Sequence, residues 1–266
     1  MATLKNTIIN DTGYLTVPSG TTSGRPGSPV NGQIRFNTDS QVLENYASSA
    51  WQTPIVTSGL IMYLDPGNKD SYSSFGTNVR DLTGSGNNGF LVNSPSYSAS
   101  YGGVLEFNGS TNYMYVPTIN LSSGASTIMG AARYTGTGTT GRIINGEYNN
   151  WLLGNWGSST QNYYAEGWVS AVGAGGNDST WRIYAGTGNT ATDSWAMYVN
   201  GALNAGPNAN GSQGPNGLAF GVYGAGGAFN SEWSASQVGF VLAYNRVLSA
   251  AEIQQNYNAF RARYSL

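Results

Sequence analysis

Apolar runs of strand length, separated by segments rich in Gly, Asn and Ser, dominate the pattern from residue 57 onward. The clearest runs lie at 59–64, 103–107, 113–116, 195–199 and 238–244. Asn200 and Gly201 directly follow one of these runs and are typical of a type I′ hairpin turn. Many short strands with such turns indicate an all-β fold, a β-sandwich or jelly roll, in a single domain. We therefore assign residues 57–266 to one large β-domain.

The end of the chain breaks the alternation and predicts one helix. Ser249 suits the N-cap position, and Glu252, three residues later, completes a capping box. The residues that follow at spacings of four, three and four, and so share one face, are Ile253, Tyr257, Phe260 and Tyr264. The other face carries Gln254, Gln255, Asn258 and Arg261. We expect this helix to pack on the sandwich through its apolar face.

Residues 1–56 read as a small, separate module. An alternating stretch over 3–17 is followed by a loop rich in Pro, Gly, Ser and Thr over 18–29. Residues 33–37 and 41–46 predict a hairpin, and 50–53 predict a further short strand. So few apolar residues make a marginal core. We expect the module to complete its core with copies of itself or with another protein.

Composition excludes several classes of function. The chain has no His and no Cys, so the usual zinc sites, haem ligation, catalytic triads with His and disulfides are excluded. Lys and Arg number 11 against 13 Asp and Glu, with no basic stripe, which argues against nucleic-acid binding. No apolar run is long enough for a transmembrane helix, and the first residues lack the apolar core of a signal peptide. A chain made in a cytoplasm that later works outside it, such as a virion component, fits this composition.

Four segments of the large domain carry a family resemblance. They are Leu60–Asp65, Val79–Pro95, Leu105–Tyr113 and Gly239–Ile253. Together they resemble the opening and the closing strands of laminin-G-like domains, in the concanavalin A-like lectin and glucanase superfamily. The resemblance spans about 57–262 and is loose over 120–190. It implies a jelly-roll β-sandwich of two antiparallel sheets with one C-terminal helix.

The N-terminal module resembles a different kind of protein. Thr21–Asp39, followed by Leu43–Tyr46 and Trp51, is similar to short modules of bacteriophage tail fibres and other virion appendages. This resemblance implies a virion structural protein on the outer surface of the particle, made in the host cytoplasm. It also implies that residues 1–56 anchor the chain to other virion proteins and form a homotrimer. The residues then expected between subunits are Ile8, Ile9, Leu15 and Val17. A short fibre and a capsid decoration both remain open.

The same resemblance makes glycoside hydrolysis a candidate activity, because the superfamily includes glycosidases. Retaining glycosidases need two close carboxyls, which one strand supplies from acidic residues two positions apart. No two acidic residues here are closer than five positions, so we expect no enzyme, with a glycoside hydrolase as the alternative. Calcium is the one metal that the oxygen ligands suit. Asn108 and Asn112 stand where relatives carry acidic residues and offer only neutral oxygens, so we expect no metal and no cofactor.

Sugar binding is the function that the aromatic residues favour. Aromatic faces stack on sugar rings, and neutral Asn, Ser and Gln bond hydroxyl groups at little desolvation cost. The densest segment of this kind is 148–156, followed by 161–164 and Trp168. We select Trp151, Trp156 and Tyr163 as binding residues, with a host-surface polysaccharide as the ligand. The competing interpretation is that these rings alternate into the core of the sandwich.

Overall fold

A computed structural model of the chain describes residues 16–38, 42–47, 50–52, 54–136 and 140–266. The chain divides into two compact units, Met1–Pro54 and Ile55–Leu266. We call them the N-terminal unit and the sandwich unit and describe each by itself. In the described ranges, no helix is both long and apolar enough to cross a membrane.

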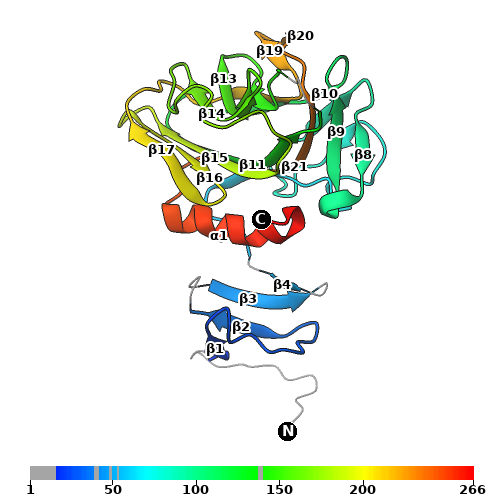
Figure 1. The fold of residues 1–266 in the computed structure, drawn as a ribbon, viewed down its shortest axis with the longest axis vertical. Helices are drawn as coiled ribbons and strands as arrows, with labels where there is room; N and C mark the ends of the chain where they lie inside the picture. Colours follow the sequence, from blue (N-terminus) through cyan, green and yellow to red (C-terminus); the bar gives the residue numbers. More distant parts are fainter. Residues whose placement is uncertain (1–15, 39–41, 48–49, 53, 137–139) are drawn as a thin grey trace. The chain divides into compact units, whose positions relative to one another are not determined.

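Two antiparallel sheets make up the sandwich unit (Figure 1). The seven-stranded sheet has the order β14 (Ser159–Ala165), β13 (Trp151–Trp156), β12 (Ile144–Gly146), β18 (Asn216–Phe220), β10 (Tyr113–Asn120), β7 (Gly89–Val92), β6 (Asn78–Val79). The eight-stranded sheet has the order β17 (Ala202–Asn208), β16 (Ser194–Val199), β15 (Arg182–Asn189), β11 (Ala125–Tyr134), β21 (Ala235–Tyr244), β9 (Val104–Asn108), β8 (Ser96–Ser98), and β5 (Leu60–Leu64) also pairs with β21. A small hairpin joins β19 (Tyr223–Ala225) to β20 (Ala228–Ser231). This architecture confirms the expected all-β sandwich of antiparallel sheets.

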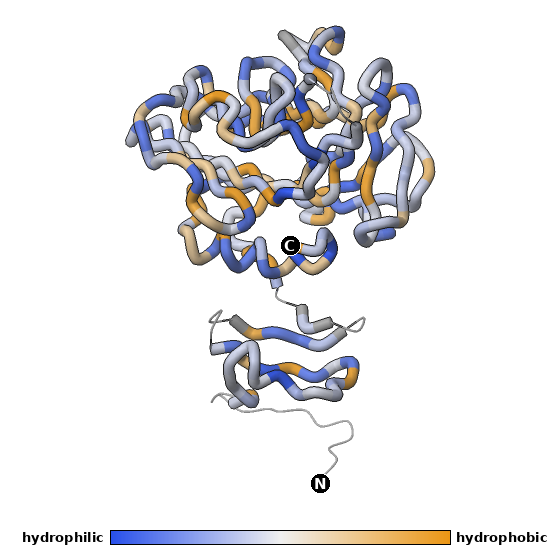
Figure 2. Tube along the Cα trace, in the orientation of Figure 1, coloured by the Kyte–Doolittle hydropathy of each residue, from blue (hydrophilic) through white to orange (hydrophobic). Residues whose placement is uncertain are grey.

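The main core lies between the two sheets, because alternate side chains of each strand point to the same side. Met114 and Val116 of β10 are buried there, as are Leu218 and Phe220 of β18. The eight-stranded sheet contributes residues such as Met197 of β16 to the same cluster. Hydrophobic positions accordingly concentrate along the strands in Figure 2, while much of the loop rim is hydrophilic.

One α-helix occurs in the described residues, α1 (Ala250–Phe260), and a 3-10 turn over Arg261–Tyr264 continues it. The helix covers the side of the eight-stranded sheet that faces away from the main core (Figure 1). Ile253, Phe260 and Tyr264 are buried there against β-sheet residues such as Phe240, which stacks on Phe260. The expected apolar helix face is confirmed, although Tyr264 lies in the 3-10 turn and Tyr257 is only half-buried.

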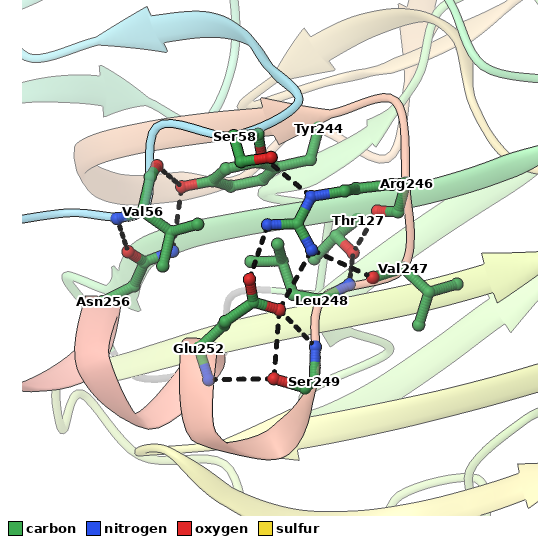
Figure 3. Close-up of polar contacts among 10 residues, drawn as sticks. All are labelled: Val56, Ser58, Thr127, Tyr244, Arg246, Val247, Leu248, Ser249, Glu252 and Asn256. Carbon is green, nitrogen blue, oxygen red and sulfur yellow. Dashed lines mark hydrogen bonds and ion pairs between the residues drawn. The ribbon is translucent and has the colours of Figure 1, made fainter. Parts of the chain in front are cut away.

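A capping box starts the helix, as the sequence predicts, and a salt bridge from Glu252 to Arg246 connects its first turn to the segment after β21 (Figure 3). Ser249 Oγ accepts a hydrogen bond from the backbone N–H of Glu252, and the Glu252 carboxylate accepts one from the backbone N–H of Ser249. The same carboxylate holds both terminal nitrogens of Arg246, at 2.6 and 3.0 Å. Thr127 on β11 donates to the Arg246 carbonyl and accepts from the Leu248 N–H. The last strand and the helix are therefore fixed to the sheet by polar contacts as well as by packing.

The Asp81 loop explains one of the segments that carry the family resemblance. Asp81 is 2% exposed, and its Oδ1 accepts hydrogen bonds from the backbone N–H groups of Tyr63 and Thr83. Its Oδ2 accepts from the N–H of Asn87, and the Thr83 hydroxyl contacts both oxygens. The Asn88 side chain accepts from the N–H of Asp81 itself. All these hydrogen bonds hold the loop in place, so this motif has a structural role.

The N-terminal unit contains a sheet of four strands, ordered β1 (Ser19–Gly20), β2 (Ile34–Asn37), β3 (Val42–Ala47), β4 (Ala50–Gln52). The β2–β3 pairing, with Phe36 opposite Leu43, confirms the predicted hairpin. Ile8, Ile9 and Leu15, expected between subunits, lie outside the described residues, and Val17 is half-buried. The role of residues 1–56 as an anchor remains a prediction.

Candidate functional site

The side of the seven-stranded sheet that faces away from the main core is rich in aromatic rings, and we call it the outer face. On β10, Tyr113 and Tyr115 alternate with the buried Met114 and Val116, so they belong to this face. Their rings are half-buried. The helix lies on the other sheet, so these rings face a side that the helix leaves uncovered.

Phe90, Tyr113, Tyr115, Phe229 and Trp233 form the first group of rings, the Tyr113 cluster. Tyr113 stacks on Phe229 of the β19–β20 hairpin, with ring centroids 4.4 Å apart, and lies 6.0 Å from Trp233. Tyr115 lies 5.6 Å from Phe90 of the neighbouring strand β7 and 5.5 Å from Phe229. Each of the five side chains is half-buried, so together they present a partly accessible aromatic surface.

Trp156, Tyr164 and Trp168 form a second group, the Trp156 cluster. Trp168 lies 5.2 Å from Trp156 and 5.0 Å from Tyr164, measured between ring centroids, and all three rings are half-buried. The indole N–H of Trp156 donates to the Glu232 carboxylate at 2.9 Å. That carboxylate also pairs with Arg142. The contact fixes the Trp156 ring in one orientation.

Arg142 supports the Trp156 cluster through the Glu232 carboxylate that Arg142 and Trp156 both contact. Its guanidinium lies 3.9 Å from the centre of the Tyr223 ring, a cation–π contact, and donates to the Asn150 side chain at 2.7 Å. The Arg142 side chain is 6% exposed, so the charge is almost fully enclosed by these partners and by Glu232. Glu232 and Trp233 are consecutive, which joins the support of the Trp156 cluster to the Tyr113 cluster through one segment.

Glu147, directly after β12, is an acidic residue whose carboxyl is buried. It is 2% exposed, and its Oε2 has no hydrogen-bond partner among the described residues. Gly217, at φ +63°, packs so closely that a Cβ there would lie 2.7 Å from this oxygen. Burial raises the pKa of the Glu147 carboxyl, and a hydrogen bond with the Tyr148 hydroxyl opposes this only in part. The carboxyl therefore holds its proton to higher pH than an exposed glutamate does.

Two of the three residues selected from the sequence need correction. Trp151 is 0% exposed and Tyr163 is 1% exposed, and both belong to the main core, where their rings contact each other edge to face. A ring covered on both faces has no surface for a sugar, so the competing interpretation holds for these two. Trp156 is partly exposed and contacts Trp168, which packs on Tyr164. Tyr164 follows the core residue Tyr163 on β14 and therefore points to the outer face, so the Trp156 cluster belongs to that face.

Sequence reasoning missed the Tyr113 cluster. Its signal is the alternation in β10, where Tyr113 and Tyr115 flank the apolar Met114, so one side of the strand carries only aromatic rings at these positions. Phe229 and Trp233 carried no such signal, because they reach the outer face only through the β19–β20 hairpin and the segment after it.

Residues 108–112, where the sequence offers calcium only neutral oxygens, form a turn in the structure. Asn108 Oδ1 accepts from the backbone N–H groups of Ser110 and Thr111, and Asn112 Oδ1 accepts from the N–H of Asn108. Both amide oxygens are therefore engaged within the turn. The described part of the chain contains no group of three or more Asp, Glu, His or Cys residues that could hold a metal ion.

No protein-family model matches the chain, and no curated protein is significantly similar to it in sequence. Solved structures do share its fold. Trypanosoma rangeli sialidase, in complex with 2,3-difluorosialic acid, is 14% identical with a TM-score of 0.53, over 85% of this chain and 44% of the sialidase. The binding domain of Paraclostridial Mosquitocidal Protein 1 is 14% identical with a TM-score of 0.55, over 76% of this chain and 52% of that one.

A third structure matches over nearly its whole length. Domain 4 of AbnA, a GH43 extracellular arabinanase from Geobacillus stearothermophilus in complex with arabinotriose, is 16% identical with a TM-score of 0.53. The similarity covers 74% of this chain and 98% of that domain. The chain thus spans about half or less of the length of the sialidase and of the Mosquitocidal Protein 1 binding domain. It covers nearly the whole length of the AbnA domain. At these identities the likeness establishes the fold alone, a lectin-type jelly roll.

Proposed function

We propose that the sandwich unit binds carbohydrate through the outer face of the seven-stranded sheet, without catalysing a reaction. The observation that carries this proposal is the pair of half-buried aromatic clusters on the side that α1 leaves uncovered. Aromatic faces stack on the apolar faces of sugar rings, while Tyr hydroxyls and Asn amides bond sugar hydroxyls. A face of this composition favours a neutral, hydroxyl-rich ligand over an ion.

Preorganisation of the rings supports the same function. Trp156 is fixed by its hydrogen bond to Glu232, and Tyr113 is held by its stack on Phe229. Rings that are already ordered lose little conformational entropy when a ligand stacks on them. The similar structures with sialic acid derivatives and with arabinotriose add support at the level of the fold, since each of those ligands belongs to its own protein.

Loss of one stacking ring is the test. A stacked ring contributes about 1–2 kcal/mol by analogy with bases on aromatic side chains, so Trp156→Ala and Tyr115→Ala should each weaken glycan binding about 5- to 30-fold. A glycan array with the intact protein selects the ligand, and tryptophan fluorescence titration measures the affinity. Tyr257→Ala is the matched control, because Tyr257 is a half-buried ring on α1, over the other sheet. Equal losses in all three folded variants would contradict the proposed face.

The proposed setting of this binding domain is the outer surface of a bacteriophage particle, as a homotrimer joined to other virion proteins by residues 1–56. This part rests on the resemblance of residues 21–39 to virion appendage modules. Three copies on one anchor would raise a weak glycan affinity through avidity. Mass spectrometry of purified particles tests the location, and a chain lacking residues 1–56 should fold but fail to incorporate. Copy number per particle separates a capsid decoration from a short fibre.

The alternative function is glycoside hydrolysis on the same face, and Glu147 is the observation that favours it. A buried carboxyl with a raised pKa is suited to act as a general acid. Hydrolysis also needs a second carboxyl at about 5–9.5 Å. Release of reducing sugar from the array-selected glycan, abolished in Glu147→Gln, would establish the enzyme. Unchanged glycan after prolonged incubation would support binding alone.

A further inference from the structure

The N-terminal unit contains a pocket of about 240 Å³ between its loop and its sheet. Pro18 and Pro26 of the loop line it, together with Ile34, Arg35 and Trp51 of the strands. The pocket therefore combines apolar walls with a guanidinium and an indole. Every lining residue belongs to the N-terminal unit, so the pocket is complete without the sandwich unit.

Two hydrogen-bond donors of these lining residues lack partners. Arg35 Nη1 and Trp51 Nε1 are buried, and neither has an acceptor among the described residues. Arg35 is 5% exposed, and its guanidinium lies over the Trp51 ring at 5.8 Å from the centroid. Buried donors are almost always paired in folded proteins. Two unpaired donors on neighbouring side chains indicate that an acceptor is missing from this place.

The charges around Arg35 are also unbalanced. The Glu44 carboxylate, which is 1% exposed, binds Arg25 in a fork at 3.1 and 2.7 Å. Arg35 reaches the same carboxylate only at 3.5 Å, and its Nη2 donates to the Thr21 carbonyl instead. One carboxylate thus serves two guanidinium groups, so the described cluster holds one positive charge in excess. An arginine in this situation is suited to a second carboxylate, which can accept two parallel hydrogen bonds.

We propose that this pocket binds the carboxylate of an acidic side chain on a partner protein. The carboxylate takes hydrogen bonds from Arg35 and Trp51, and the residue beside it packs on Ile34. Ile34 lines the pocket and is 50% exposed, so an apolar neighbour of the acidic residue has a surface to cover. Identification of the partner as a virion protein rests on the proposed function, whereas the carboxylate specificity does not.

Peptide probes test the specificity on the full-length chain. N-acetyl-Leu-Asp-amide is titrated while the indole N–H signal of Trp51 is followed by NMR, with N-acetyl-Leu-Asn-amide as the neutral control. We expect a saturable shift with the aspartyl peptide and an affinity at least about tenfold lower for the asparaginyl peptide. Sodium acetate, against sodium chloride at equal ionic strength, probes the carboxylate alone. Binding of acetate as tightly as the peptide would overturn the protein partner in favour of small anions.

Two conservative variants locate the site. Trp51→Phe removes one donor and keeps a ring against Tyr46, while Arg35→Lys keeps the charge near Glu44 and removes the unpaired Nη1 donor. Followed on the backbone N–H signals of the unit, each should lower the peptide affinity at least about fivefold. Arg182→Lys, an arginine paired with Asp178 in the sandwich unit, is the control. No shift with the aspartyl peptide, equal shifts with both peptides, or full affinity in both variants would overturn the proposal. Glycan binding and virion incorporation are measured separately, so their failure is distinguishable from this one.

Discussion

Asn256 on α1 is a buried polar residue in the middle of a helix, and its replacement should destabilise the sandwich unit. Its side chain is 0% exposed and forms a closed set of contacts visible in Figure 3. Asn256 Oδ1 accepts from the Val56 backbone N–H at 2.8 Å, and its Nδ2 donates to the Tyr244 hydroxyl at 2.9 Å. The Tyr244 hydroxyl in turn donates to the Val56 carbonyl at 2.9 Å. The triangle joins the start of the unit, its last long strand and its helix.

Asn256→Ala breaks two sides of this triangle. The Val56 N–H loses its acceptor in a site that is 8% exposed, whereas the Tyr244 hydroxyl keeps its bond to the Val56 carbonyl. A stranded buried donor costs about 1–3 kcal/mol and a lost hydrogen bond about 1 kcal/mol, while alanine returns about 0.5 kcal/mol of helix propensity. The free energy of unfolding should fall by about 2–3 kcal/mol, which lowers the Tm of a unit of this size by about 5–10 °C.

Asn258→Ala is the matched control, since this half-buried residue only accepts a 3.3 Å hydrogen bond from Gln254 on the helix surface. Both variants gain the same helix propensity, so their difference isolates the buried contacts. Urea unfolding and calorimetry of the two variants measure it, and Tyr244→Phe completes a double-mutant cycle with Asn256→Ala. A difference below about 1 kcal/mol, or strict additivity in the cycle, would refute the reasoning.

Three further predictions concern carboxyl groups. Glu147→Gln should raise the free energy of unfolding near pH 7. Burial raises the pKa of the Glu147 carboxyl, so the wild-type protein loses stability as the pH rises through that pKa. Urea midpoints measured from about pH 4 to pH 8 should therefore show the gain only at the upper end. The Arg246 hydrogen bond lowers the pKa of Glu252 to about 2, so Glu252→Gln should cost stability at neutral pH and progressively less as the pH falls toward 2, and an NMR titration reads that pKa directly. Asp81→Ala leaves the backbone N–H groups around that carboxylate without acceptors and should cost more than about 3 kcal/mol, with loss of hydrogen-exchange protection at Tyr63 as the local readout.

Local sequence patterns were sufficient to predict the elements that depend on neighbouring residues alone. The capping box at Ser249 and Glu252 needs only three residues of spacing, and the structure contains it. The β2–β3 hairpin and the alternation of β10 likewise follow from neighbouring residues. The buried role of Asn256 does not follow from a local pattern, because the Val56 N–H that its side chain accepts from lies 200 positions away in the sequence.

The sequence by itself determined that this is an all-β chain with one C-terminal helix, because strand alternation and helix capping are properties of adjacent residues. Which aromatic rings are accessible was decided only by the tertiary structure. Trp151 and Trp156 lie on the same strand, yet one is enclosed between the two sheets and the other is half-exposed beside Trp168. A ring's accessibility depends on which side of the sheet it occupies and on what packs over that side, and both are set by segments distant in the sequence, such as the helix on one sheet and the β19–β20 hairpin on the other.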